Sequence, residues 1–188
     1  MADQIKDGTG GAYLAGVSSS NRLEVSARVN ERIYYASRDD KKAFVVQFHH
    51  TQAVGGVVAG CGYIEYTGSN RLNVKQVTIS SEDAGMGKFG VWELPTVSGG
   101  AAKIPVNLNF GSTLTSETTC KEDADGTLLN ITGGNSLYTV RTDGVQTIVL
   151  DFYDAIILGP NNVIGFRSNA ATTGTKTRIN VMFHESIE

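Results

Sequence analysis

The sequence predicts an all-β protein: an antiparallel jelly-roll β-sandwich of about eight to ten strands with an extended N-terminal arm. Three features predict it. Apolar and polar residues alternate with a period of two along most of the chain, as in half-buried strands. Glycine is abundant, at 22 of 188 residues, and clusters of Gly, Asn, Asp and Pro separate the alternating segments. No apolar stripe with helical spacing persists for three turns.

The length favours one main domain, since domains usually hold roughly 100–200 residues. Strands this numerous without a βαβ rhythm indicate a sandwich or barrel, and a length well above that of a seven-strand immunoglobulin domain favours a jelly roll with long loops. We therefore expect residues 31–188 to form the sandwich and residues 1–30 to form an arm or hairpin outside it.

The first predicted strand covers residues 22–29, whose apolar residues all fall on one face. The turn-forming run 18–21 precedes it and follows a short apolar run at 13–15. Residues 12–29 are therefore expected to fold as a hairpin or a folded-back arm.

Further strands follow in the middle of the chain. In the segment 44–48, Phe44, Val46 and Phe48 share one face. In 72–79 the apolar residues stand first on even and then on odd positions. One extra residue in the strand would keep all of them on the same face. We expect a β-bulge near Lys75 and Gln76 that bends this strand.

The remaining strands complete the sandwich. Residues 104–110 place their apolar side chains on one face and Pro105 on the other, which indicates an edge strand or a strand start. Residues 148–158 run into a turn at 159–162, and 163–166 follow it. In a last predicted strand, Ile179, Val181 and Phe183 share one face.

Charge excludes one broad class. The 16 Lys and Arg against 19 Asp and Glu give a net charge of -3, and Lys41-Lys42 is the longest basic run. A general nucleic-acid binder is therefore not expected, because affinity for phosphates is built from clustered basic residues. The chain also has no secretory signal pattern and no run of roughly 18–20 apolar residues, so we expect a soluble protein made in a cytoplasm, without membrane contact.

The residues that carry catalytic or metal chemistry are few. His49 and His50 would point to opposite faces of a strand, which disfavours joint chelation, and His184 has no carboxylate at a revealing spacing. The segment 122–127 resembles the start of a calcium loop but lacks its third and last ligands, so we interpret it as an acidic solvated turn. We predict no metal site and no cofactor.

No enzyme motif is present. The chain contains no GxSxG elbow, and the glycine-rich run 8–11 lacks the strand and the Lys-Ser/Thr of a phosphate loop. Cys61 and Cys120 lie 59 positions apart in no CxxC pair, so we expect two isolated buried thiols, with their pairing left open. No catalytic residue is predicted.

Aromatic residues offer a recognition alternative. A sugar-stacking platform could be made from Tyr34, Tyr35, Tyr63, Tyr66 and Trp92, because flat rings suit carbohydrate faces. The competing interpretation is that these residues pack the sandwich or a subunit contact.

Two parts of the chain resemble virion proteins of tailed bacteriophages. At the N-terminus the string 5–15, followed by Val17 and by 21–25, is similar to an opening that recurs in such proteins. In the C-terminal half, 105–112 and 158–164 with the closing strand resemble phage jelly-roll proteins. Together these segments cover about half of the chain.

The resemblance implies a non-enzymatic structural protein, a capsid decoration or cement protein on the outside of a phage head, synthesised in the host cytoplasm. Such proteins are often homotrimers that clamp neighbouring capsomers against the pressure of packaged DNA. The implied partners are the major capsid protein and further copies of this chain, with no nucleic acid and no membrane. The family supplies no catalytic residues.

The N-terminal arm is the expected capsid contact. Its glycines allow close approach to a neighbouring surface, its charged residues can pair with capsid charges, and an extended arm can add a strand to an exposed sheet edge. The predicted contact residues are Lys6, Asp7, Gly8, Gly10, Gly11, Tyr13 and Arg22.

Two other functions stay open. One is a receptor- or carbohydrate-binding module of a phage tail fibre, head fibre or baseplate, which would use Trp92 and the tyrosines. The other is an enzyme such as a cupin-like metalloprotein, which is the weakest because the chain offers too few histidines for such a metal site.

Overall fold

A computed structural model describes residues 16–17, 23–24, 36–37, 40–81, 86–124 and 128–186. The chain divides into two units, residues 1–31 and residues 32–188. In the first unit, β1 (Gly16–Val17) pairs antiparallel with β2 (Leu23–Glu24). Most of the predicted arm and of the predicted strand at 22–29 lies outside the described residues.

Thirteen strands are described in the second unit, more than the eight to ten predicted for the sandwich. Eight of them are long, with eight to thirteen residues each. They are β3 (Ala43–Thr51), β4 (Ala59–Tyr66), β5 (Leu72–Ser81), β6 (Met86–Glu93), β12 (Asn135–Asp143), β13 (Gln146–Leu158), β14 (Val163–Ala170) and β15 (Lys176–Glu185). Shorter strands lie between β6 and β12: β7 (Thr96–Gly99), β8 (Ala101–Lys103), β9 (Val106–Asn107), β10 (Thr118–Glu122) and β11 (Leu129–Thr132).

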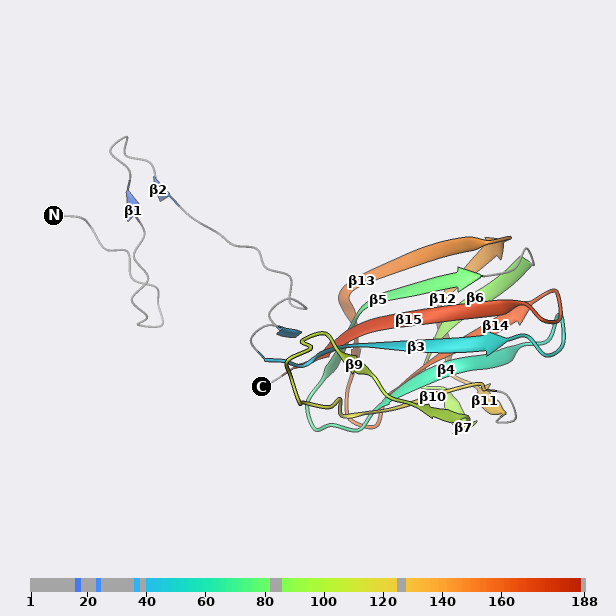
Figure 1. Cartoon of the computed structure of the whole chain (residues 1–188), viewed down its shortest axis with the longest axis horizontal. Coiled ribbons are helices and arrows are strands. Elements are labelled where there is room, and N and C mark those ends of the chain that lie inside the picture. The colour runs from blue at the N-terminus through green and yellow to red at the C-terminus, as the bar shows by residue number, and fades with distance from the viewer. Residues whose placement is uncertain are drawn as a thin grey trace. The chain divides into compact units, whose positions relative to one another are not determined.

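These strands form two main sheets that are stacked face to face (Figure 1). The five-stranded sheet has the order β13-β5-β15-β3-β9, and the six-stranded sheet has the order β12-β6-β14-β4-β10-β8. The strand pairs in both sheets are antiparallel. The prediction of an all-β protein with antiparallel sheets packed as a sandwich is therefore confirmed.

The core lies between the two sheets and follows directly from the alternation in the sequence. Phe44 and Phe48 of β3 are fully buried, as are Phe183 of β15 and Phe166 of β14. Phe44 stacks on Phe183 with ring centroids 5.7 Å apart within one sheet, and Phe48 meets Phe166 at 5.8 Å across the sandwich. The buried faces predicted for 44–48 and for 179–183 are confirmed.

Close approach of the sheets depends on Gly62. It lies in β4, beside Phe166 of β14 in the register of the six-stranded sheet. A Cβ at this position would lie 2.4 Å from the Phe48 ring, well inside van der Waals contact. The ring of Phe48 therefore occupies the space that any larger residue at position 62 would need.

A two-stranded ribbon of β7 and β11 covers part of the outer face of the six-stranded sheet. Ile131 of β11 packs where β4 and β14 carry glycines: a Cβ on Gly60 or on Gly165 would meet Ile131 atoms at 2.9 or 3.1 Å. Leu129 and Tyr63 join this second apolar cluster. The glycines here serve side-chain packing rather than turns.

The predicted bulge in β5 is confirmed. Met182 of β15 pairs with Gln76 and the next residue, Phe183, pairs with Val74, so Lys75 is the extra residue. The neighbouring strand β13 carries a larger irregularity at the same level, where Asp151 pairs with Gln76 and Ile156 pairs with Val74.

The strand predicted at 104–110 with one buried face is wrong. The chain crosses here from one sheet to the other: β8 pairs with β10 in the six-stranded sheet, and β9 pairs with β3 in the five-stranded sheet. Pro105 lies between them. Because each sheet takes only two or three residues, the apolar side chains of this segment never share a core face, and Ile104 and Phe110 are 85% and 89% exposed. The predicted edge position is confirmed, since β8 and β9 each end a sheet.

Replacing Gly62 by Ala tests the sheet contact. We expect Gly62→Ala to lower the free energy of unfolding by about 1–3 kcal/mol, because the new methyl group overpacks the Phe48 ring. Gly111→Ala is the matched control, since a Cβ there meets its nearest atom at 3.5 Å. Urea unfolding measures both variants, and equal stability of the two would contradict the packing account.

Candidate binding sites

The predicted arm contacts cannot be placed in a site. Lys6, Asp7, Gly8, Gly10, Gly11, Tyr13 and Arg22 all lie outside the described residues. The candidate sites below therefore come from the sandwich itself, where the sequence offered only the aromatic platform as an alternative.

His49 and His50 do lie on opposite faces of β3, with His49 exposed and His50 buried. No group of three or more His, Cys, Asp and Glu side chains that could hold a metal occurs among the described residues.

His50 organises a buried polar network at one end of the sandwich. Its Nδ1 lies 3.0 Å from Oδ2 of Asp123, and its Nε2 lies 3.2 Å from Oε1 of Gln52. The Gln52 amide nitrogen donates to the carbonyls of Val54 and Val57 at 2.8 and 2.7 Å, which fixes its orientation. The Gln52 oxygen therefore faces His50 Nε2 as an acceptor, and the Asp123 carboxylate faces Nδ1. The network ties the loop after β3 to the end of β10.

The acidic segment that starts at Glu122 is only partly described, and its described residues are not a solvated turn. Glu122 ends β10, is buried, and forms an ion pair with Lys103 at 2.8 Å. It also accepts the backbone N–H of His49 at 2.8 Å. The expectation of a solvated turn is wrong at Glu122, because pairing with Lys103 makes burial of the carboxylate acceptable.

A second His–Asp pair was missed by the sequence. Nε2 of His184 lies 3.3 Å from Oδ1 of Asp154, and both side chains are largely buried. Nearby, Lys75 lies 3.8 Å from Asp151 and 5.1 Å from the centroid of the Tyr153 ring. The irregular stretch of β13 brings these groups to β5 and β15. In the sequence, the phase change at Lys75 is the only sign of these contacts, and it does not show which strand supplies the partner residues.

Among the described residues, Tyr63, Tyr66 and Trp92 do not form an exposed aromatic platform. Tyr63 and Tyr66 are buried, and Tyr34 and Tyr35 lie outside the described residues. The Arg167 guanidinium covers the Trp92 ring at 4.6 Å from its centroid and donates a hydrogen bond to the carbonyl of Gly133. Partial burial lowers the pKa of Arg167. For Tyr63 and Tyr66, the interpretation that they pack the sandwich is confirmed.

The segment that closes one edge of the sandwich exposes large apolar side chains. We call Ile104, Val106, Phe110 and Leu114 the edge strip; all four are exposed. Exposed apolar residues that gather in one segment mark an interaction site more often than single scattered ones do.

The backbone under the edge strip is held in place by side-chain amides. Asn107 donates to the carbonyls of Lys41 and Leu114 at 2.7 and 3.2 Å, and Asn109 donates to the carbonyl of Ser37 at 3.0 Å. The strip is therefore a fixed surface, so little conformational entropy is lost when a partner covers it.

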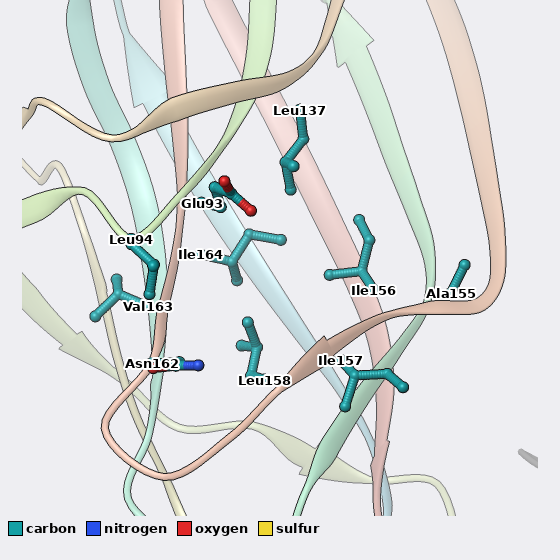
Figure 2. Close-up of a pocket in the computed structure, with 10 residues that line it drawn as sticks. All are labelled: Glu93, Leu94, Leu137, Ala155, Ile156, Ile157, Leu158, Asn162, Val163 and Ile164. Carbon is teal, nitrogen blue, oxygen red and sulfur yellow. The ribbon is translucent and has the colours of Figure 1, made fainter.

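A pocket opens near β12 and β13, which are the edge strands of the two sheets on the side opposite β8 and β9 (Figure 2). We call it the edge pocket; its volume is about 240 Å³. Ten residues line it: Glu93, Leu94, Leu137, Ala155, Ile156, Ile157, Leu158, Asn162, Val163 and Ile164. Eight of these residues have apolar side chains, while Glu93, Asn162 and backbone atoms give the lining its polar part.

Comparison of the chain with protein-family models, with curated proteins and with solved structures finds no match in any of the three. In the part of the chain that the structure describes, no helix has the length and hydropathy needed to span a bilayer.

The two cysteines are free and buried, as the sequence predicted for isolated thiols. Burial raises the pKa of Cys120 to about 12 and also raises that of Cys61, where the charge of Asp123 adds to the effect. Both thiols are therefore protonated at neutral pH and poor nucleophiles.

Thiol labelling tests this environment. We expect neither Cys61 nor Cys120 of the folded protein to react with an aromatic disulfide reagent at pH 8, whereas both react after unfolding in denaturant. Fast labelling of either thiol in the native protein would contradict the described burial.

Glu185 gives the stability a predictable pH dependence. Burial raises the pKa of this carboxyl, while hydrogen bonds from Ser116 Oγ at 2.6 Å and from the Glu117 backbone N–H at 2.7 Å oppose the rise. Between the ordinary value of 4.5 and the raised value, the folded protein binds more protons than the unfolded chain. The stabilisation from Glu185 is therefore complete below pH 4.5 and is lost as pH rises through the raised pKa.

The variant Glu185→Gln removes this titration. Relative to the natural protein, its free energy of unfolding should increase from pH 4 to pH 7, as measured by urea unfolding at several pH values. A difference that stays constant over this range would show that Glu185 does not titrate with a raised pKa.

Proposed function

We propose that this protein is a non-enzymatic decoration protein of a tailed phage, which binds the major capsid protein on the outside of the head and stabilises the shell. Two arguments support this proposal. The sequence resembles phage virion proteins in about half of its length, and the sandwich carries a fixed apolar edge strip that its own core does not use. The edge strip is the observation that carries the proposal.

We also infer that the sandwich is a jelly roll, which is a common fold of viral capsid domains. Numbered one to eight in chain order, the long strands of a jelly roll form one sheet of strands one, eight, three and six, and another of strands two, seven, four and five. The orders β3-β15-β5-β13 and β4-β14-β6-β12 agree with this scheme. The short strands β7 to β11 are then an insertion between the fourth and fifth strands.

The edge strip suits attachment to a shell better than binding of a small molecule. It lies along a sheet edge around β9, and its apolar side chains are exposed to solvent. Covering Ile104 and Phe110 removes large apolar surface from water, at roughly 25 cal/mol per Å². A protein that binds only the assembled shell stabilises it by mass action, with no turnover required.

Copies of the chain bound around a local threefold axis would clamp adjacent capsid subunits, so we include homotrimer formation in the proposal. The proposal also includes the predicted capsid contacts of the N-terminal arm, whose residues lie outside the described part of the chain. The apolar strip supplies affinity in this account, and the charged arm residues would add pairing at the rim.

The carbohydrate-binding alternative receives less support from the geometry. Its tyrosines 63 and 66 are buried, and one face of Trp92 is covered by Arg167. A sugar ring would have to displace the guanidinium or use the other face. Binding to a glycan array that is lost in Trp92→Ala would favour this alternative over a decoration protein.

Bare shells of the phage that encodes the chain provide the test. We expect the purified protein to co-sediment with shells that lack it and to raise their disruption temperature. The double variant Ile104→Ser and Phe110→Ser should bind at least about tenfold more weakly, because burying each side chain is worth roughly 1.5–3 kcal/mol.

The control is Val145→Ser, in the turn between β12 and β13, where the valine is 74% exposed. It should bind like the natural protein. Failure of the natural protein to bind or stabilise shells would contradict the decoration role. Unchanged binding of the double variant would instead show that the edge strip is not the contact.

A further inference from the structure

The edge pocket opens from the surface into the core. Its floor is made by Leu158 and Ile164, which belong to the central apolar cluster and are buried. Figure 2 shows Leu137, Ile156 and Leu158 pointing toward the space in front of Ile164, from strands of both sheets. A ligand here would contact the core without any rearrangement of the sheets.

The rim of the pocket is apolar and half exposed. Leu94, Leu137 and Ile157 each expose more than two fifths of their side chains while lining the opening. These residues come from the end of β6, from β12 and from β13. Apolar surface arranged around an opening, rather than packed across it, is typical of a small-molecule site.

Backbone irregularities surround the opening. The ladder of β12 with β6 shifts between Ser136 and Tyr138, which leaves Leu137 without a partner in the register. The ladder of β13 with β5 shifts between Asp151 and Ile156. Leu94 adopts φ of 46°, in the left-handed region that residues with a side chain rarely adopt. Bulges and strained residues of this kind concentrate beside binding sites.

Glu93 supplies the charge. Among the described residues that line the pocket, it is the only charged one, and Figure 2 shows its carboxylate between Leu137 and Ile164. Its Oε1 accepts a hydrogen bond from the Asn135 amide at 2.9 Å. This neutral partner orients the carboxylate without cancelling its charge, so the group can still accept a hydrogen bond from a ligand.

From this geometry we infer that the edge pocket binds a small ligand with an apolar body and one cationic hydrogen-bond donor, such as an alicyclic or branched aliphatic amine. The apolar body lies on Leu158, Ile164 and the rim leucines, and the ammonium group donates to Glu93. The volume is below the roughly 300–1,000 Å³ of pockets for drug-sized ligands, so the ligand is smaller than these. This inference does not depend on the proposed capsid role.

Two probes of matched shape and opposite charge test it, with the full chain labelled for NMR. Cyclohexylmethylamine should shift the amide resonances of pocket residues such as Leu94, Ile156 and Ile164, at the millimolar concentrations expected for so small a molecule. Cyclohexanecarboxylate should bind at least about tenfold more weakly, because a charge-assisted hydrogen bond is worth roughly 1.5–3 kcal/mol and Glu93 repels an anion.

Three variants assign the binding to the pocket. Glu93→Gln keeps the side-chain length and the acceptor for Asn135, so the preference for the amine should disappear. Leu137→Trp places a larger side chain at the rim and should abolish binding of both probes. Val149→Trp changes a similarly exposed residue of β13 that does not line the pocket, and it should leave binding unchanged.

Several results would overturn the inference. They are an absence of shifts at pocket residues with the amine, equal affinity for the two probes, or an amine preference that survives in Glu93→Gln. Loss of binding in Val149→Trp to the same extent as in Leu137→Trp would also contradict it.

Discussion

The contact of Phe48 with Gly62 and Phe166 is the constraint on which the sandwich depends. Phe48 crosses from the five-stranded sheet to the bare backbone of Gly62 and lies against Phe166. Immediately after Phe166 the ladder of β14 with β4 shifts by one residue. The extra residue is Cys61 of β4, so the shift changes the phase of β4, while the ladder of β14 with β6 is unbroken at this level. Phe166 therefore faces the core, and the next residue, Arg167, lies over Trp92 on the outer face. The packing between the sheets and the surface of the six-stranded sheet thus meet in adjacent residues of β14.

The two edges of the sandwich differ in structure. At one end, β8 and β9 close the sandwich with a single crossing segment, and its apolar side chains are left outside as the edge strip. At the other end, β12 and β13 are both irregular, and the space between them is the edge pocket. In between, the strands that cover the core carry only single-residue bulges, one in β5 against β15 and one in β4 against β14. The proposed shell contact and the inferred ligand site thus both use places where the regular pairing of the sheets stops.

The sequence predicted the regular parts of this fold because period-two alternation is a local property. It located the buried faces of β3 and β15, and the phase change at Lys75 located the bulge in β5. The same rule failed at 104–110, since alternation cannot reveal that a segment divides itself between two sheets. The pairs His50–Asp123 and His184–Asp154 join residues 73 and 30 positions apart, so they depend on strand order rather than on any spacing. For the same reason neither the edge strip nor the edge pocket was among the predicted sites.

The central functional claim is that the edge strip faces the shell. Hydrogen–deuterium exchange of the protein, free and bound to bare shells, tests it most directly because it locates the contact without changing a residue. The account predicts slower exchange in residues 104–114 on binding, with no change in the turn around Val145. Protection of that turn or of the outer strands, with exchange at 104–114 unaltered, would contradict the account.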